Sequence, residues 1–271
     1  MEIKEIERSI IKKYRKELRS PFIRSVCEYE LANDNDKIAV AISGGKDSLL
    51  LAKLMQELHR HSKYKFELEF ICMDPGYEKV FRKKLEENLK LLEIPAHIFD
   101  SEVFAISEKI SGDYPCYMCA RMRRGNLYAK AKELGCNKIA LGHHFNDVIE
   151  TTMMNVLFSG NFKTMKPKLK AQNFKGMQLI RPLYKVHEED IIKRRDYIGL
   201  NALNCACSVT KKKEGYTRLK VKNLIKELKK EIPDVDKSIF KSAENVNCDM
   251  VLGFSEHGVK KSFLDEFKKG E

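Results

Sequence analysis

Two hydrophobic periods alternate along the first 160 residues of the chain. Apolar runs with the length of β-strands occur at 37–42, 66–73, 96–99 and 138–141. The segments between them repeat apolar residues every three or four positions, as amphipathic helices do, at 48–60, 78–92 and 148–158. The segment 116–134 is expected to start as a loop and to continue as a helix. Strands that alternate with helices at this spacing predict an α/β fold with a doubly wound parallel sheet.

The pattern is different at the two ends of the chain. Apolar residues on one face of 1–14 predict an amphipathic N-terminal helix. Residues 161–178 have no clear period and predict a basic loop, while 177–183 suits a last strand and 188–197 a helix. From Thr217 onward the sequence predicts lysine-rich helices.

The length of 271 residues suits one domain with smaller appendages. We expect an N-terminal helical segment at 1–30, an α/β domain at 31–210 and a helical, basic C-terminal extension at 211–271. No stretch approaches the roughly 18 apolar residues that a membrane span needs. The N-terminus is charged from its second residue, unlike a secretory signal. These features predict a cytoplasmic protein without membrane association.

The chain is basic, with a formal net charge of +12. Lysine and arginine crowd two segments, at Lys163, Lys166, Lys168, Lys170 and Lys175, and at Lys211, Lys212, Lys213, Arg218, Lys220 and Lys222. Such clusters gain binding energy from phosphate-rich partners through counterion release. A solvated basic surface is the alternative, but the clustering favours nucleic acid as the partner.

The turn at 41–48, AISGGKDS, joins the first strand to the next helix. Backbone N–H groups at such a turn bind phosphate, and Gly44 and Gly45 remove the Cβ atoms that would block its approach. The side chains add a cation and two hydroxyl donors, from Lys46, Ser43 and Ser48. The neighbouring Asp47 repels phosphate unless Mg²⁺ lies between them. The turn therefore predicts a phosphate site with Mg²⁺.

This turn is not a Walker A loop, because Val40 and Asp47 stand where that motif needs Gly and Ser or Thr. SGGKDS instead resembles the PP-loop of the ATP pyrophosphatases, α/β enzymes that bind ATP by its β- and γ-phosphates. They transfer AMP to a substrate and release pyrophosphate, so the resemblance implies ATP as co-substrate. Asp74 and the GHHFND segment at 142–147 also follow strands, and we expect them in the same crevice.

Four of the eight cysteines lie in pairs, Cys116 with Cys119 and Cys205 with Cys207. In a reducing compartment they are not expected to form disulfides. Three interpretations fit their spacing: a zinc site with all four thiolates, a thioredoxin-like redox pair, or an iron–sulfur cluster bound by three cysteines. The spacing alone leaves these alternatives open.

The segment DYPCYMCARMRRGNLYAKAKELGCNKIALGHHFNDVIETTMMNVLFSGNFKTMKPKL, with SGGKDS and LIRPLYKVHEEDI, resembles the TtcA family of tRNA 2-thiocytidine synthetases. The resemblance covers about 30–208. In that family CxxC and a downstream cysteine bind a [4Fe-4S] cluster. This implies Cys116, Cys119 and Cys207 as ligands. The third is less direct, because this chain has Cys205-Ala-Cys207 where the family has CxxC.

The resemblance also implies a reaction and its residues. The C2 oxygen of a tRNA cytosine, at position 32 in the family, attacks the α-phosphorus of MgATP, and sulfur then replaces the adenylate. Catalytic roles are implied for Lys46, Arg123 and Asp147. The implied ATP site is Ala41, Ser43, Gly44, Gly45, Lys46, Asp47, Ser48, Met73, Gly142 and Asp147. Asp147 could bind Mg²⁺ or transfer protons, whereas Arg123 could instead belong to a tRNA-facing basic edge.

The family further implies tRNA as substrate, a cysteine desulfurase as sulfur donor and a homodimer. Three rival functions share part of this pattern. Another PP-loop ligase, such as lysidine synthetase, has no need of paired cysteines. A uridine thiolase usually has zinc-finger cysteines at both termini, where Cys27 and Cys248 stand alone. A non-catalytic, zinc-stabilised RNA-binding protein has no use for Lys46 or Asp47.

Overall fold

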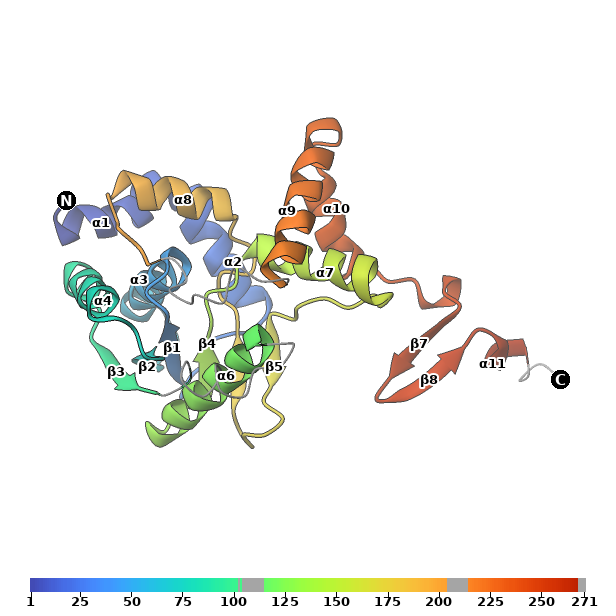
Figure 1. The fold of residues 1–271 in the computed structure, drawn as a ribbon, viewed down its shortest axis with the longest axis horizontal. Helices are drawn as coiled ribbons and strands as arrows, with labels where there is room; N and C mark the ends of the chain where they lie inside the picture. The colour runs from blue at the N-terminus through green and yellow to red at the C-terminus, as the bar shows by residue number, and fades with distance from the viewer. Residues whose placement is uncertain (102, 104–114, 204–213, 268–271) are drawn as a thin grey trace.

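The structure is a computed structural model that describes residues 1–101, 103, 115–203 and 214–267 (Figure 1). A six-stranded sheet in the order β3-β2-β1-β4-β6-β5 forms its centre. The strands are β1 (Lys37–Ile42), β2 (Glu67–Asp74), β3 (Ala96–Asp100), β4 (Lys138–Ala140), β5 (Lys168–Lys170) and β6 (Gln178–Ile180). All neighbours pair in parallel except β5 with β6. The predicted parallel sheet is confirmed. The strands that follow β1 are added on one side of it as far as β3, and β4 then lies on its other side, so the topological switch point lies between β1 and β4.

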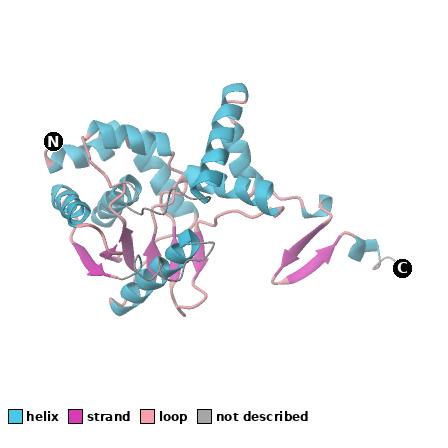
Figure 2. Ribbon diagram, in the orientation of Figure 1, coloured by secondary structure: helices cyan, strands magenta, loops and turns pink. Residues whose placement is uncertain are grey.

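Helices cover both faces of this sheet (Figure 2). One face packs against the N-terminal helices, α3 (Lys46–His61), α4 (Lys79–Leu91) and α8 (Glu188–Tyr197). The other packs against α6 (Pro115–Glu133). Side chains of β1 alternate between the two layers, with Ile38, Val40 and Ile42 in the larger core and the small Ala39 and Ala41 facing α6.

The N-terminal segment is helical, as predicted. It consists of α1 (Ile3–Arg8), two π-helical turns η1 (Ser9–Lys13) and η2 (Arg15–Arg19), and α2 (Ser20–Glu28). Its apolar residues Ile6, Ile10, Leu18 and Phe22 are buried in the larger core. Burial on this scale makes the segment part of the domain rather than a separate unit.

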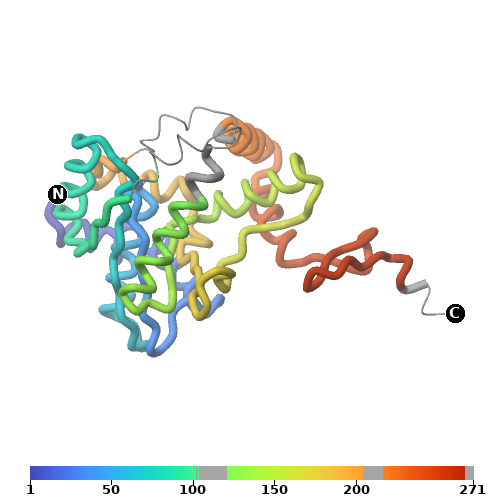
Figure 3. Tube along the Cα trace, turned by 60° about the horizontal axis from the view of Figure 1, so that its bottom comes forward, coloured from blue at the N-terminus to red at the C-terminus, as the bar shows by residue number. Residues whose placement is uncertain are grey.

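A smaller core joins the C-terminal region to the sheet domain. Helices α7 (Phe145–Ser159), α9 (Glu214–Glu231) and α10 (Val235–Ser242) enclose Phe145, Ile149, Val221 and Ile225. Beyond them lie η4 (Cys248–Met250), strands β7 (Gly253–Glu256) and β8 (Val259–Ser262), and α11 (Leu264–Phe267). This last segment projects from the body of the molecule in both views (Figures 1 and 3).

The structure corrects three sequence predictions. Helix α6 begins at Pro115, the first-turn position that proline favours, and not after a loop. The predicted basic loop contains β5, an edge strand that has no buried residue and therefore no strand-like apolar pattern. The C-terminal extension is not wholly helical, because His257 and Gly258 both have positive φ and turn the chain into the β7–β8 hairpin. None of the helices in the described part of the chain is long and apolar enough to cross a membrane.

Candidate nucleotide-binding active site

The SGGKDS turn is stabilised by its own serines. The Ser43 N–H donates to Ser48 Oγ at 3.1 Å, and the Ser48 hydroxyl donates to the Gly45 carbonyl oxygen at 2.9 Å. Gly44 has a φ of +79°, and a Cβ there would lie 2.6 Å from Leu203 Cδ1. Protein contacts alone therefore fix the shape of the turn between β1 and α3.

Two helix N-termini meet beside this turn. Helix α3 follows β1 and helix α7 follows β4, and these strands are parallel neighbours. A Cβ on Gly142 would lie 3.1 Å from the Ser48 nitrogen and 3.2 Å from the Asp47 carbonyl carbon. The two backbones are thus in near contact. Helix N-termini present unpaired N–H groups and positive dipole ends, so this junction favours a phosphate.

A cavity of about 570 Å³ opens at this junction. Eight residues predicted from the sequence line it: Ala41, Ser43, Asp47, Ser48, Met73, Arg123, Gly142 and Asp147. Four arginines also line it, Arg123, Arg124, Arg181 and Arg218, which gives it a strongly cationic wall. Among the other predicted residues, Gly44 and Gly45 shape the turn. The predicted clustering of strand-end residues is thus found for the PP-loop and GHHFND.

Asp74, which was expected in the same crevice, has a different role. Its carboxylate accepts hydrogen bonds from the Gly76 and Tyr77 N–H groups at 2.9 and 2.7 Å and from Arg82 at 2.7 Å. Burial would raise its pKa, but these hydrogen bonds lower it. Asp74 therefore stabilises the turn that follows β2.

Lys46 faces an adjacent cavity of about 330 Å³. Its Nζ lies 3.1 Å from Asp47 Oδ2 and 3.1 Å from Glu188 Oε1. Burial would lower the pKa of Lys46, but the charges of these two carboxylates raise it. Asp47, Asp147 and Arg218 line both cavities and so mark their common border.

Asp147 lies in the first turn of helix α7 and forms a capping box with His144. The His144 N–H donates to Asp147 Oδ2 at 3.0 Å, and the Asp147 N–H donates to His144 Nδ1 at 3.4 Å. Burial would raise the pKa of Asp147, but the two neighbouring histidines, the His144 N–H and Arg218 lower it. Asp147 is therefore an oriented carboxylate at the cavity wall.

His143 and His144 have different environments. His144 caps α7, whereas His143 lines the larger cavity, and its Nδ1 has no hydrogen-bond partner within the described residues. Burial lowers the pKa of His143 to about 4. Its imidazole is therefore neutral at physiological pH.

Glu150, Arg181, Glu188 and Arg218 complete the site, and the sequence did not single them out for it. Burial raises the pKa of Glu150 to about 7 and lowers that of Arg181 to about 10. Glu188 pairs with Lys222 as well as Lys46. Glu150 is the only charged residue in 148–158, and this was a usable signal for it. The other three reach the site from distant segments of the sequence.

The predicted cluster ligands are only partly placed. Cys116 and Cys119 lie in the first turn of α6, three residues apart, and the same helix contains Arg123. Positions with this spacing share one face of a helix. Cys205 and Cys207 lie outside the described residues, so the choice between them stays a prediction.

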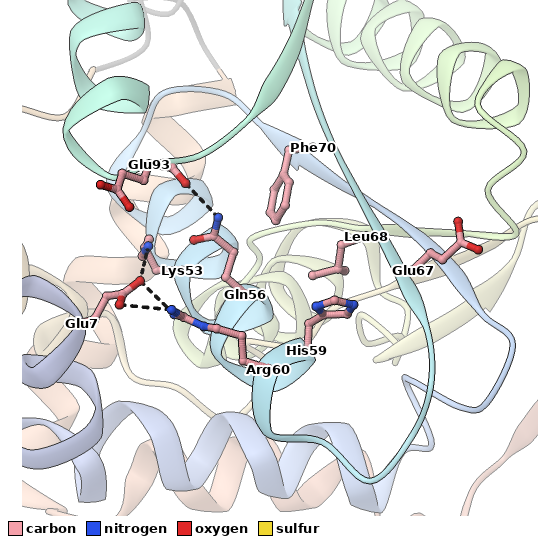
Figure 4. Close-up of a pocket in the computed structure, with 9 residues that line it drawn as sticks. All are labelled: Glu7, Lys53, Gln56, His59, Arg60, Glu67, Leu68, Phe70 and Glu93. Atoms are coloured by element: carbon pink, nitrogen blue, oxygen red, sulfur yellow. Dashed lines mark hydrogen bonds and ion pairs between the residues drawn. The ribbon is translucent and has the colours of Figure 1, made fainter. Parts of the chain in front are cut away.

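Another cavity, of about 480 Å³, lies at the opposite end of the sheet (Figure 4). Three of its charged groups, Glu7, Lys53 and Arg60, form ion pairs. Glu7 of α1 accepts hydrogen bonds from Lys53 and Arg60, both at 2.8 Å, and Lys53 also donates to the Leu92 carbonyl oxygen at 2.9 Å. The Lys53 side chain is 2% exposed. This junction fastens α1 to α3 and α4.

Known proteins resemble this chain in sequence and in fold. The PP-loop domain family model matches residues 11–228. A tRNA-cytidine(32) 2-sulfurtransferase of Pelobacter propionicus is 36% identical over 232 residues, which cover 85% of this chain and 86% of that protein. One from Geotalea uraniireducens is 39% identical over 226 residues, which cover 82% of this chain and 88% of that protein. The solved U34-tRNA thiolase NcsA from Methanococcus maripaludis, with its [4Fe-4S] cluster, has a TM-score of 0.67 at 24% identity and covers 89% of this chain and 77% of that chain.

The parallel sheet, the SGGKDS turn and the cavity beside it define a PP-loop ATP-binding protein. The chain belongs to this family, and within it to the family of tRNA-cytidine(32) 2-sulfurtransferases. The resemblances inferred from its motifs are confirmed.

Proposed function

We propose that this chain is an ATP-dependent tRNA sulfurtransferase that replaces the C2 oxygen of cytidine 32 with sulfur. The main support is its identity of 33–39% with tRNA-cytidine(32) 2-sulfurtransferases over most of its length. The same stretch contains the PP-loop cavity with its wall of arginines. That wall suits both ATP and an RNA backbone.

In the first step, the C2 oxygen of the base attacks the α-phosphorus of ATP. The bond from that phosphorus to the bridging oxygen breaks, and pyrophosphate leaves. Adenylation makes the C2 oxygen a good leaving group. Attack of sulfide-level sulfur at C2 then displaces AMP without any net change of oxidation state.

The residues at the cavity have roles that follow from their charge. Lys46 and Arg123 are proposed to stabilise negative charge on the phosphates as pyrophosphate leaves. Ala41, Met73 and Gly142 line the cavity at the strand ends and are proposed to contact the nucleotide there. Carboxylate oxygens are the ligands that Mg²⁺ prefers, and Asp47 Oδ1 is buried without a hydrogen-bond partner in the described part of the chain. Asp47 and Asp147 are therefore the proposed Mg²⁺ ligands, and Asp147 is also suited to transfer protons.

Cys116, Cys119 and Cys207 are the proposed ligands of a [4Fe-4S] cluster. The spacing of three residues between the first two, within α6, fits a shared metal group. A cluster held by these three thiolates would supply an iron with an open coordination position for sulfur. A cysteine desulfurase as sulfur donor, a homodimer and a cytoplasmic location complete the proposal.

The test is a reconstituted reaction without oxygen, with ATP, Mg²⁺, cysteine, a cysteine desulfurase and tRNA. We expect AMP and 2-thiocytidine to form in equal amounts on tRNA with cytidine at position 32, and neither on the same tRNA with uridine there. If AMP forms and a different base is thiolated, the reaction class stands but the assignment of cytidine 32 as the substrate base is wrong. If tRNA stimulates no AMP formation, the proposal fails, and a non-catalytic RNA-binding protein becomes the better interpretation.

A further inference from the structure

Arg218 reaches the active site from the C-terminal extension. Helix α9 packs on α7 through Val221 and Ile225, which are 1% and 7% exposed, against Phe145 and Ile149. Residues 218, 221 and 225 are spaced by three and four positions, so their side chains share one face of the helix. The packing that anchors α9 therefore also points Arg218 toward the PP-loop cavity.

The guanidinium of Arg218 contacts two acids on α7. Its Nη1 lies 2.9 Å from Asp147 Oδ1 and 3.8 Å from Glu150 Oε2. The Arg218 side chain is nevertheless 42% exposed, and it lies at the border that the two cavities share. It is held by one good hydrogen bond and has space to move.

Lys46 of the PP-loop is held more tightly than Arg218, because it has two carboxylate partners and is only 19% exposed. Lys46 lies between Asp47 and Glu188, and Lys222 pairs with Glu188. Four acids, Asp47, Asp147, Glu150 and Glu188, thus face three cations, Lys46, Arg218 and Lys222. Acids therefore outnumber cations in the smaller cavity, and phosphate charge is accommodated on this side if Mg²⁺ takes carboxylates or a cation turns toward the phosphates. Arg218 is suited to turn, because its planar guanidinium can bind two phosphate oxygens at once.

We propose that Arg218 is a catalytic arginine that binds the β- and γ-phosphates of ATP and stabilises the departing pyrophosphate. Helix α9 is then part of the active site and not an accessory RNA-binding element. The role of Arg218 in stabilising the leaving group rests on the proposed adenylation reaction. Its contact with the phosphates of ATP is independent of that reaction, and this contact can be measured without tRNA.

The binding test compares a non-hydrolysable ATP analogue with AMP. We expect Arg218→Met to weaken binding of α,β-methylene-ATP by about 10-fold or more, the usual effect of a lost charge-assisted contact. AMP affinity should change less than about twofold, because AMP lacks the β- and γ-phosphates. Arg218→Lys should have an intermediate effect. Lys226→Met is the matched control, since it removes one charge from the exposed surface of the same helix.

Two outcomes would overturn the proposal. If Arg218→Met binds both nucleotides like the wild type, Arg218 does not contact phosphate. If it weakens both equally, Arg218 only positions Asp147. Thermal melting of each variant separates these results from unfolding.

The turnover test follows tRNA-dependent AMP formation. We expect Arg218→Met to lower kcat by about 10²–10³-fold, the range for loss of one transition-state donor, with Lys226→Met close to wild type. If the wild type makes no AMP, the proposed function fails, while the nucleotide-binding comparison still decides the phosphate contact. If the kcat of Arg218→Met equals that of the wild type, Arg218 has no role in the departure of pyrophosphate.

Discussion

Lys46 and Glu188 are 142 residues apart in the chain, yet Lys46 Nζ lies 3.1 Å from Glu188 Oε1. Glu188 is the first residue of α8, and its backbone N–H donates to Asn146 Oδ1 at 2.9 Å. Glu188 thus connects the PP-loop lysine, through its carboxylate, to α7, through its backbone N–H. It also adds a negative charge next to the proposed phosphate site.

This relationship predicts that Glu188→Gln binds ATP more tightly in the absence of divalent metal. One fewer negative charge within a few ångströms of the phosphates should raise the affinity about 3–10-fold at low salt. The exposed Glu189 provides the control Glu189→Gln, which should change little. Equilibrium binding of α,β-methylene-ATP in EDTA measures the effect. Weaker binding would mean instead that Glu188 is needed to orient Lys46.

Gly142→Ala should damage the nucleotide site directly. Its Cβ would lie 3.1 Å from the Ser48 nitrogen, a backbone atom that cannot move without opening the turn. We expect a loss of about 1–3 kcal/mol in the free energy of unfolding and weaker ATP binding. Gly125→Ala is the matched control, because a Cβ there meets open space within helix α6. It should be neutral or stabilising by about 0.5–1 kcal/mol. Urea unfolding compares the two, and equal effects would contradict the close approach at Gly142.

Glu7→Gln should loosen α1 from α3. The hydrogen bond from Arg60, with the charge of Lys53, lowers the pKa of Glu7 to about 2 from its usual 4.5. Its stabilising contribution is therefore complete above pH 4.5 and is lost as the pH falls toward 2. We expect the variant to lose about 1–2 kcal/mol at neutral pH and to approach the wild type near pH 2. Chemical denaturation over this range would contradict the pairing if the difference were independent of pH.

Glu150→Gln should have the opposite dependence on pH. Burial raises the pKa of this carboxyl to about 7, so the folded state keeps its proton while the unfolded chain releases it above about 4.5. The free energy of unfolding of the wild type therefore falls as the pH rises from 4.5 to 7, whereas that of Glu150→Gln, which has no proton to release there, does not. We expect the variant to be about 1–3 kcal/mol more stable at pH 8 and equal at pH 4. A variant that is less stable at pH 8 would show that the ion pair with Arg218 outweighs the cost of burial.

The cysteine assignment predicts a pattern of metal loss. Protein purified without oxygen should contain about four irons and four sulfides. Both should be lost in Cys116→Ala, Cys119→Ala and Cys207→Ala but kept in Cys205→Ala. The exposed Cys27 supplies the control Cys27→Ala. Loss in both Cys205→Ala and Cys207→Ala would show that the CAC segment was misassigned, and one zinc without sulfide would exclude the cluster.

The sheet was predictable because its inner strands are buried on both faces. KIAVAI and ELEFICMD are nearly continuous apolar runs at their C-terminal ends, the pattern typical of parallel strands. Lys168–Lys170 and the β7–β8 hairpin lack this pattern, because their side chains are mostly exposed. Period alone could not separate such strands from loops.

The site was predictable only where one motif contained it. The turn from Ser43 to Ser48 and the GHHFND segment reach the cavity by following adjacent strands. Glu188 and Arg218 reach it through tertiary packing of α8 and α9, which no local pattern encodes. Their charges resembled those of ordinary exposed residues in acidic and lysine-rich segments.

The ion pairs around the PP-loop can form only after most of the chain has been synthesised. Lys46 pairs with Glu188, and Glu188 pairs with Lys222. The phosphate-binding turn leaves the ribosome long before these partners exist. A chain that stops before α9 therefore has the PP-loop but lacks the residues that complete its charge balance. Premature termination should yield an inert fragment, and it should not yield an enzyme that consumes ATP without modifying RNA.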